Sequence, residues 1–285
     1  AVQLDIPFKM YDFENEYHHK VVDYMLDEYK SGRTPNPDVM CNQEIKFKLF
    51  LNTCLEDGAD LIATGHYART KNSQLLMASN KDKDQTYFLY RVNSEALSKT
   101  LFPIGEFKTK KEVRAIAQKL KLVTAEKKDS QGICFVGKVG IKDFLQQYVT
   151  AKKGVILDQH GVAIGEHDGA IFYTIGQRHG LNIGGGLPYY VVGKDMSKNQ
   201  VFVTTDLQDS KLWNEQISLT NLHWINESPD NTKTYLARLR YRAPLVKCKI
   251  LGKSLKLTEP VRAVTPGQSA VLYDGERVVG GGIVI

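Results

Sequence analysis

The chain has 285 residues, 42% of them hydrophobic and 25% charged, and its formal net charge at pH 7 is +6. This length accommodates two or three domains with cores of their own, and no apolar run approaches the ~18–20 residues of a membrane-spanning helix. The composition therefore predicts a globular protein with no membrane partner, and the modest positive charge is compatible with a polyanionic partner.

Four cysteines in a chain of this length do not form a disulfide scaffold. No two of them have the spacing of a metal clip, so the sequence predicts no metal site. No signal segment opens the chain. We therefore expect a cytoplasmic location, where a disulfide would be transient and catalytic.

The first part of the chain alternates strand-like and helix-like patterns. Residues 6–13 are expected to form a strand and 14–30 a helix that ends at Ser31-Gly32. The prolines of 34–37 predict a loop, which is followed by a helix over 41–57 and a short buried strand over 60–64. This alternation is typical of a parallel sheet flanked by helices. The chain opens without Met, in the pattern of a helix end, so we expect it to begin inside a domain.

A capping-box pair, Thr109 and Glu112, predicts the start of a further helix. Residues 126–137 have no period and are expected to form a loop that contains Cys134.

After about residue 138 the pattern changes to short β-like runs, and from about residue 209 it is strongly β. Such runs are typical of a barrel or a sandwich. We therefore expect an α/β domain over 1–137, a small, mostly β domain over 138–208 and a C-terminal β-barrel domain over 209–285. The strands expected in the last two domains cover 155–157, 162–164, 189–192, 200–204, 234–242, 245–251, 255–257, 270–273 and 278–285.

Two cysteines lie in polar, turn-forming segments beside an aspartate, which suits a side chain that a substrate must reach. Cys41 is expected near a helix start, where the helix dipole lowers a thiol pKa, and Asp38 is close enough to serve as a general acid or base. Alternatively, Asp38 only caps the helix and Cys41 fills its first turn. Cys134 lies in a loop rich in Asp, Ser, Gln and Gly. It is either a mobile side chain that accepts a group from a partner or a half-buried loop residue.

The other two cysteines, Cys54 and Cys248, are expected in cores. His66 follows a strand end, where open α/β sheets bind ligands, and is either a ligand contact or structural. The charged residues 81–85 form either a solvated turn or a nucleotide clamp.

Three arginines alternate along one expected strand and would project from one face. These are Arg238, Arg240 and Arg242, with Lys247 and Lys249 on the next strand. The face is either a phosphate-contacting surface or an ordinary solvated one.

Seven stretches occur in one order along the chain: Asn36-Pro37-Asp38 with Cys41-Asn42, residues 63–69, Lys83-Asp84-Gln85, residues 129–135, residues 173–178, Arg240-Tyr241-Arg242 and Pro266-Gly267-Gln268. Together they resemble the tRNA-specific 2-thiouridylase family over essentially the whole chain. The resemblance implies that the α/β domain is Rossmann-like, of the ATP-pyrophosphatase type, and incomplete in this sequence.

The resemblance also implies the chemistry. ATP, with Mg²⁺, adenylates the C2 oxygen of the wobble uridine, and sulfur then arrives as a cysteine persulfide from a donor, either a sulfur-relay protein or a cysteine desulfurase. Cys134 resembles the persulfide carrier. Cys41 resembles the second cysteine, which releases the sulfur and leaves a transient Cys41–Cys134 disulfide. Asp38 resembles the acid/base residue.

The resemblance also assigns the residues that bind ATP and tRNA. The protein is expected to act as a monomer. Gly65 matches an ATP-contacting position. The positions that match tRNA contacts are Asn36, Pro37, Asp38, His66, Lys83, Asp84, Gln85, Arg240, Tyr241 and Gln268.

One departure from the family pattern concerns ATP. The Gly-rich pyrophosphate loop of the family, of Ser-Gly-Gly-x-Asp-Ser type, does not occur in this sequence. Its backbone N–H groups would hold the phosphates, so the chain by itself is expected to bind ATP poorly.

Three other functions stay open. A 4-thiouridine or 2-thiocytidine synthetase of the same group would carry different accessory domains. If the protein were only an RNA-binding module, its tRNA binding would not depend on Cys41 or Cys134, and it would transfer no sulfur. A thiol–disulfide oxidoreductase is disfavoured by the absence of a Cys-x-x-Cys motif.

Overall fold

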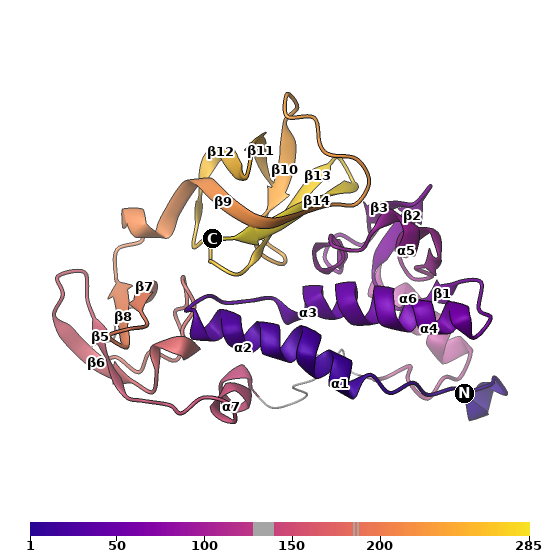
Figure 1. Ribbon diagram of the computed structural model, residues 1–285, viewed down its shortest axis with the longest axis horizontal. Helices are drawn as coiled ribbons and strands as arrows, with labels where there is room; N and C mark the ends of the chain where they lie inside the picture. Colours follow the sequence, from indigo (N-terminus) through magenta and orange to yellow (C-terminus); the bar gives the residue numbers. More distant parts are fainter. Residues whose placement is uncertain (128–139, 185, 187) are drawn as a thin grey trace.

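The computed structural model describes residues 1–127, 140–184, 186 and 188–285. A pair of long helices runs along one side of the molecule, with a barrel above the pair and a small sheet beyond one end of it (Figure 1). None of the described helices has the length and apolar content that crossing a bilayer requires.

The first long helix confirms the prediction for 14–30. It consists of α1 (Glu14–Tyr17), a π-helical turn η2 (His18–Val22) and α2 (Asp23–Lys30), after a short 3₁₀ turn η1 (Val2–Leu4). Its buried side chains recur with helical spacing and form one apolar face. They are Val21, Val22, Met25, Leu26 and Tyr29.

The second long helix begins earlier than predicted. It consists of α3 (Pro37–Met40), the π-helical η3 (Cys41–Phe50) and α4 (Leu51–Glu56). Proline is favoured at the first helical position because its missing N–H has no partner there and its φ is already helical. The two long helices lie side by side and run in opposite directions (Figure 1).

A short parallel pair of strands follows. β1 (Ile62–Ala63) lies within the predicted 60–64 strand and pairs with β4 (Thr100–Leu101). The strand predicted for 6–13 is wrong. Ile6, Phe8 and Met10 alternate as in a strand, but all three are exposed, and the segment pairs with no strand in the described part of the chain. A strand needs a neighbour for its backbone hydrogen bonds.

A hairpin that the sequence reading missed links the α/β part to the barrel. β2 (Ala68–Lys71) and β3 (Gln74–Met77) meet at Asn72-Ser73, where both residues have positive φ, as a type I′ hairpin turn requires. β3 then pairs with β14 of the barrel through Leu76 and Arg277. Glu276, the residue before Arg277, accepts hydrogen bonds from Arg69 Nη2 and Lys81 Nζ, each at 2.6 Å.

The predicted capping box is confirmed. Thr109 Oγ1 accepts a hydrogen bond from the Glu112 N–H at the start of α6 (Lys110–Lys119). The remaining short helices are η4 (Thr86–Phe88), α5 (Ser94–Ser98) and α7 (Ile141–Gln146), of which α7 packs on the first long helix through Leu145.

The central sheet has the order β6-β5-β8-β7. Its core contains Ile156, Val191, Val201 and Val203. Its strands match the predicted runs within a few residues: β5 (Gly154–Leu157), β6 (Ala163–His167), β7 (Tyr190–Asp195) and β8 (Gln200–Thr204), with a 3₁₀ turn η5 (Ala170–Phe172) between β6 and β7.

The C-terminal strands close into a barrel of order β13-β10-β11-β12-β9-β14, because β13 also pairs with β14. Closure removes the free edges of a sheet. The barrel follows a 3₁₀ turn η6 (Ser210–Leu212), and its strands are β9 (Trp213–Trp224), β10 (Tyr235–Arg238), β11 (Val246–Leu251), β12 (Ser254–Arg262), β13 (Ser269–Asp274) and β14 (Arg277–Val284).

The predicted 234–242 strand is too long. β10 ends at Arg238, and Arg240 and Arg242 lie in the turn that follows, where Arg242 has φ 63°. The three arginines therefore do not share one strand face.

The barrel core predicts a stability difference within one hairpin. Leu255 is 0% exposed, whereas Leu251 on the paired strand is 52% exposed. Leu255→Ala should lower the free energy of unfolding by about 2–5 kcal/mol through lost burial and a cavity. Leu251→Ala should change it little. Urea unfolding of the two variants measures the difference, and equal effects would contradict this packing.

Candidate functional site

The long loop between the two helices ends at the residues predicted to surround a substrate base. Asn36 has an extended backbone, with φ −116° and ψ 91°, and Pro37 begins the helix. Asp38 lies in the first turn, where the positive end of the helix dipole stabilises a carboxylate. The geometry thus places an anion-favouring helix start directly after a stiff, proline-containing loop.

Cys41 lies one turn further along than predicted. Its side chain is 5% exposed and packs with Val21 and Ile45, between the two long helices. Because the helix dipole acts mainly within the first turn, its effect on this thiol is smaller than the sequence suggested. Cys134 lies outside the described residues, so the structure gives no distance between the two sulfurs.

Of the other two cysteines, Cys248 lies in a core as predicted, whereas Cys54 is only partly buried. Cys248 is fully buried inside the barrel, and burial raises the pKa of its thiol to about 12. Cys54 packs against the core of the α/β part, and burial together with Asp57 raises its pKa. Both thiols therefore stay protonated at neutral pH.

His66 is held in an apolar pocket. Its ring packs against Phe47 and Phe102, and its Nδ1 lies 2.9 Å from Thr64 Oγ1. Burial, with a smaller contribution from Lys46, lowers the pKa of His66 to about 3. The imidazole is therefore neutral at physiological pH, and any contact with RNA would be a neutral hydrogen bond.

Gly65, at the carboxyl end of β1, is exposed and has no atom within 4 Å of where a Cβ would lie. The Thr64 N–H donates to the Leu101 carbonyl at 3.0 Å, so the ends of β1 and β4 lie together. Nucleotides bind at such strand ends in open α/β sheets.

Asp84 is buried although it belongs to a charged loop. Its side chain is 0% exposed and accepts hydrogen bonds from the Ala78 N–H at 2.9 Å, Thr86 Oγ1 at 2.8 Å and Arg238 Nη1 at 3.1 Å. Arg238 belongs to β10, so this ion pair joins the loop to the barrel. In this conformation the Asp84 carboxylate is not open to RNA.

The ion pair brings two predicted tRNA-contacting stretches together. Tyr241 packs on Phe88, with ring centroids 4.4 Å apart, and the guanidinium of Arg242 lies 5.3 Å from the centre of the Tyr241 ring. Arg240 and Arg242 are exposed on either side of it. Between this turn and the charged loop lies a cavity of about 450 Å³. It is lined by Lys81, Asp82, Lys83, Asp84, Arg238 and Arg242.

Two predicted tRNA contacts have partners within the protein. Gln85 Oε1 accepts a hydrogen bond from the Tyr67 N–H at 2.9 Å. Gln268 Nε2 donates to the Thr34 carbonyl at 2.8 Å.

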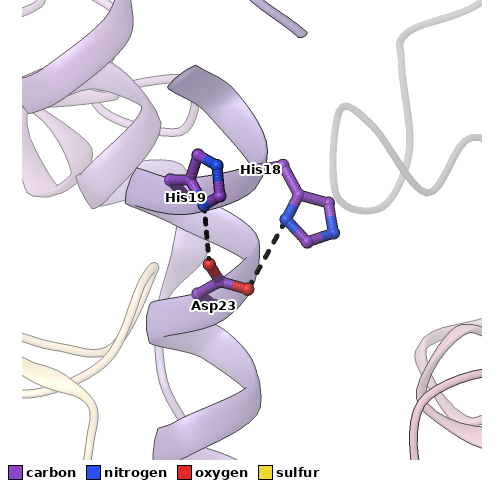
Figure 2. A group of neighbouring side chains, drawn as sticks. All are labelled: His18, His19 and Asp23. Atoms are coloured by element: carbon purple, nitrogen blue, oxygen red, sulfur yellow. Dashed lines mark hydrogen bonds and ion pairs between the residues drawn. The ribbon is translucent and has the colours of Figure 1, made fainter. Parts of the chain in front are cut away.

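A group that the sequence reading missed lies on the first long helix. His18 Nδ1 and His19 Nδ1 lie 3.5 Å and 3.2 Å from the two carboxylate oxygens of Asp23 (Figure 2). The π-helical turn brings His18 and Asp23, five residues apart, onto one face. These three are the one set of potential metal ligands found among the described residues. Both imidazoles are exposed, and the contacts are those of a carboxylate–imidazole network on the surface.

Comparison with known proteins identifies the family. The chain is 48% identical to the tRNA-specific 2-thiouridylase MnmA of Bacillus pumilus, 47% to that of Bacillus subtilis and 45% to that of Streptococcus thermophilus. The alignments cover 99–100% of this chain and 79–80% of the relatives.

This chain belongs to the tRNA-specific 2-thiouridylase family.

Three family models match successive parts of the chain. They are described as the tRNA methyl transferase HUP domain, over residues 1–138, the tRNA methyl transferase PRC-barrel domain, over 142–205, and the Aminomethyltransferase beta-barrel domain, over 214–284. The predicted fold class, an α/β domain followed by a small β domain and a barrel, is confirmed. The methyl transferase wording differs from the names of the relatives. The relatives decide the family, because they align with the whole chain at high identity.

The buried ion pair predicts a stability effect specific to Asp84. Asp84→Asn leaves Arg238 buried without its counter-charge and should lower the free energy of unfolding by about 3–5 kcal/mol. Urea unfolding at neutral pH measures the loss. Asp82→Asn, an exposed change in the same loop, is the matched control, and similar small effects in both variants would contradict the role of the pair.

The environment of His66 predicts a pH dependence of stability. The folded-state pKa is lowered to about 3 from its ordinary value of 6.5, so between these values the unfolded chain binds a proton that the native state does not. Stability then falls as pH drops from 6.5 toward 3, by up to about 1.4 kcal/mol per pH unit. His66→Gln should flatten this slope in urea midpoints recorded between about pH 7 and about pH 4.5. The exposed His160→Gln is the control, and an unchanged slope in His66→Gln would contradict the burial of a neutral imidazole.

Proposed function

We propose that this chain catalyses the ATP-dependent 2-thiolation of the wobble uridine of tRNA, as a sulfurtransferase. The observation that carries the proposal is the 48% identity with a tRNA-specific 2-thiouridylase over 99% of the chain. The division into domains at 1–137, 138–208 and 209–285 stays part of this proposal and is supported by the separate cores of the central sheet and the barrel.

In the first step, uridine O2 attacks the α-phosphorus of ATP, and pyrophosphate leaves. The adenylated C2 then carries AMP, which is a far better leaving group than oxide. Asn36, Pro37 and Asp38 surround the base. The Asp38 carboxylate accepts the N3 proton of the uridine as O2 attacks, and returns it to N3 when the thiocarbonyl forms. A single-stranded anticodon loop lets such a base be splayed into a pocket.

In the second step, the terminal sulfur of a Cys134 persulfide attacks C2 and displaces AMP. The Cys41 thiolate then attacks the Cys134 sulfur and breaks the S–S bond, which leaves sulfur on C2 as the thiocarbonyl and a Cys41–Cys134 disulfide. An external thiol supplies the two electrons that restore both cysteines. Because Cys41 is 5% exposed, its attack requires a local opening around Val21 and Ile45.

ATP, bringing Mg²⁺ with it, fits the open end of β1 at Gly65. The backbone there leaves room for close approach of a ligand, and the exposed strand ends are the usual place for a nucleotide. When bound, ATP supplies the activating adenylyl group. The sulfur donor is a persulfide-bearing protein, a sulfur-relay protein or a cysteine desulfurase.

The surface between the charged loop and the barrel fits the tRNA backbone. Lys81, Lys83 and Arg242 line the cavity, and Arg240 and Tyr241 lie in the turn that also carries Arg242. Cationic groups and an aromatic ring of this kind are what RNA contacts require. We further propose a cytoplasmic location, where tRNA and reducing thiols are present, and action as a monomer.

Single-turnover sulfur transfer to unmodified tRNA, with ATP and a persulfide donor, tests this function. The alignments cover 79–80% of the relatives, so the assay uses this chain and a version extended by a segment that carries the Ser-Gly-Gly-x-Asp-Ser loop of the family. We expect the extended protein to form 2-thiouridine, and Cys41→Ser and Cys134→Ser to abolish the product, because each sulfur has a separate task. Mercury-containing gels resolve thiolated from unmodified tRNA.

Two controls separate this function from the alternatives. Cys248→Ser changes a barrel thiol outside the proposed mechanism and should leave thiolation intact. S-adenosylmethionine in place of ATP and persulfide tests methyl transfer, which the description of the family models would suggest. Methylated product, or full activity in both serine variants of the proposed pair, would overturn the mechanism.

A further inference from the structure

The loop before the catalytic helix is held by the two β parts of the chain. Its Thr34 N–H donates to the Pro266 carbonyl at 2.8 Å, and its Thr34 and Pro35 carbonyls accept hydrogen bonds from Gln268 Nε2 at 2.8 and 3.3 Å. On its other side, Thr34 Oγ1 lies 3.1 Å from Thr174 Oγ1 of the central part. The barrel turn thus holds the loop at Thr34 and Pro35, the two residues before Asn36.

This contact requires the backbone of the barrel turn to lie very close to the backbone of the loop. Gly267 has φ +91°, and a Cβ there would lie 2.8 Å from Thr34 N and 2.9 Å from its carbonyl atoms. Such distances leave no room for a side chain, so glycine is the residue that this approach requires. The Gly267 N–H donates to the Val284 carbonyl at 2.9 Å and the Val284 N–H to the Gln268 carbonyl at 2.8 Å, which fixes the turn to the last barrel strand.

The sequence of the loop explains why it needs an outside donor. Two of the residues in Thr34-Pro35-Asn36-Pro37 are prolines, which lack a backbone N–H and have a fixed φ. The loop therefore satisfies few of its own carbonyls, and the Gln268 amide supplies hydrogen bonds to two of them. The prolines also stiffen the segment, so the position set at Thr34 and Pro35 is passed on to Asn36 and Asp38.

We propose that Gln268 is a positioning residue, which holds the Asn36–Asp38 segment in register with the barrel. The barrel also carries Arg240 and Tyr241, so one rigid body would present both the surface that grips tRNA and the segment that receives its base. The proposal rests on the proposed function of Asp38. It gives Gln268 a task in holding the loop, because its amide nitrogen donates to the carbonyls of Thr34 and Pro35.

Gln268→Met keeps the length of the side chain and removes the amide, so it isolates this role. In the extended protein we expect single-turnover thiolation at saturating tRNA to fall about tenfold, with the Kd for tRNA changed by less than about twofold, because two hydrogen bonds to the loop are lost. The exposed Gln208→Met is the matched control and should match the wild type in both measurements. Weaker tRNA binding with an unchanged rate at saturation would overturn the proposal, as would no change in either.

Hydrogen exchange of the ligand-free protein gives a readout that does not depend on catalysis. The Thr34 amide, which donates to Pro266, should exchange about tenfold faster in Gln268→Met, while amides of β11 and β12 keep their protection. Unchanged exchange at Thr34 would overturn the proposal. If the Thr34 amide exchanges faster in Gln268→Met but the extended wild-type protein does not thiolate tRNA, the hold of Gln268 on the loop is supported and the proposed function is rejected.

Discussion

A buried carboxylate, that of Asp84, ties the α/β part of the chain to the barrel. Removing a charged group from water is costly unless it is paired and fully hydrogen-bonded, and Asp84 meets this condition only when Arg238 of β10 is in place beside the Ala78 N–H and Thr86. The loop and the barrel therefore have a single relative placement. That placement creates the basic cavity between them and lets Tyr241 pack on Phe88.

The same association of the barrel with the α/β part also positions the catalytic segment, residues 36–38. The barrel turn at Pro266-Gly267-Gln268 meets the loop at Thr34, and the hairpin β2–β3 extends the barrel sheet through β14. Groups distant in sequence thus reach one region through these backbone contacts and through a shared apolar core, to which Tyr87 of the α/β part and Val271 and Tyr273 of the barrel belong. Side chains whose charge suggests ligand binding, such as Asp84, can therefore act by holding other residues in place.

Much of the local structure followed from the sequence. The apolar spacing from Tyr17 to Leu26 predicted the first helix, and Thr109 with Glu112 predicted the start of α6, because both signals act within one or two turns. The predictions were wrong where the local structure depends on contacts with another part of the chain. Residues 6–13 have a strand-like alternation but no neighbouring strand in the described chain, and the alternating arginines leave the sheet after Arg238 because the chain turns there. The Asn72-Ser73 turn was a readable signal for the hairpin that the sequence reading missed.

The sequence by itself determined the family, the three-part fold and the identity of the candidate residues, because ordered motifs and periodicity are properties of the chain alone. Only the tertiary structure decided the state of those residues. It buried Cys41 between two helices and left His66 neutral in an apolar pocket, with its pKa lowered to about 3. It also turned Asp84 and Gln268 toward protein partners. The reason is that burial, hydrogen bonding and pKa depend on neighbours brought together from positions tens to hundreds of residues away, which no local pattern records.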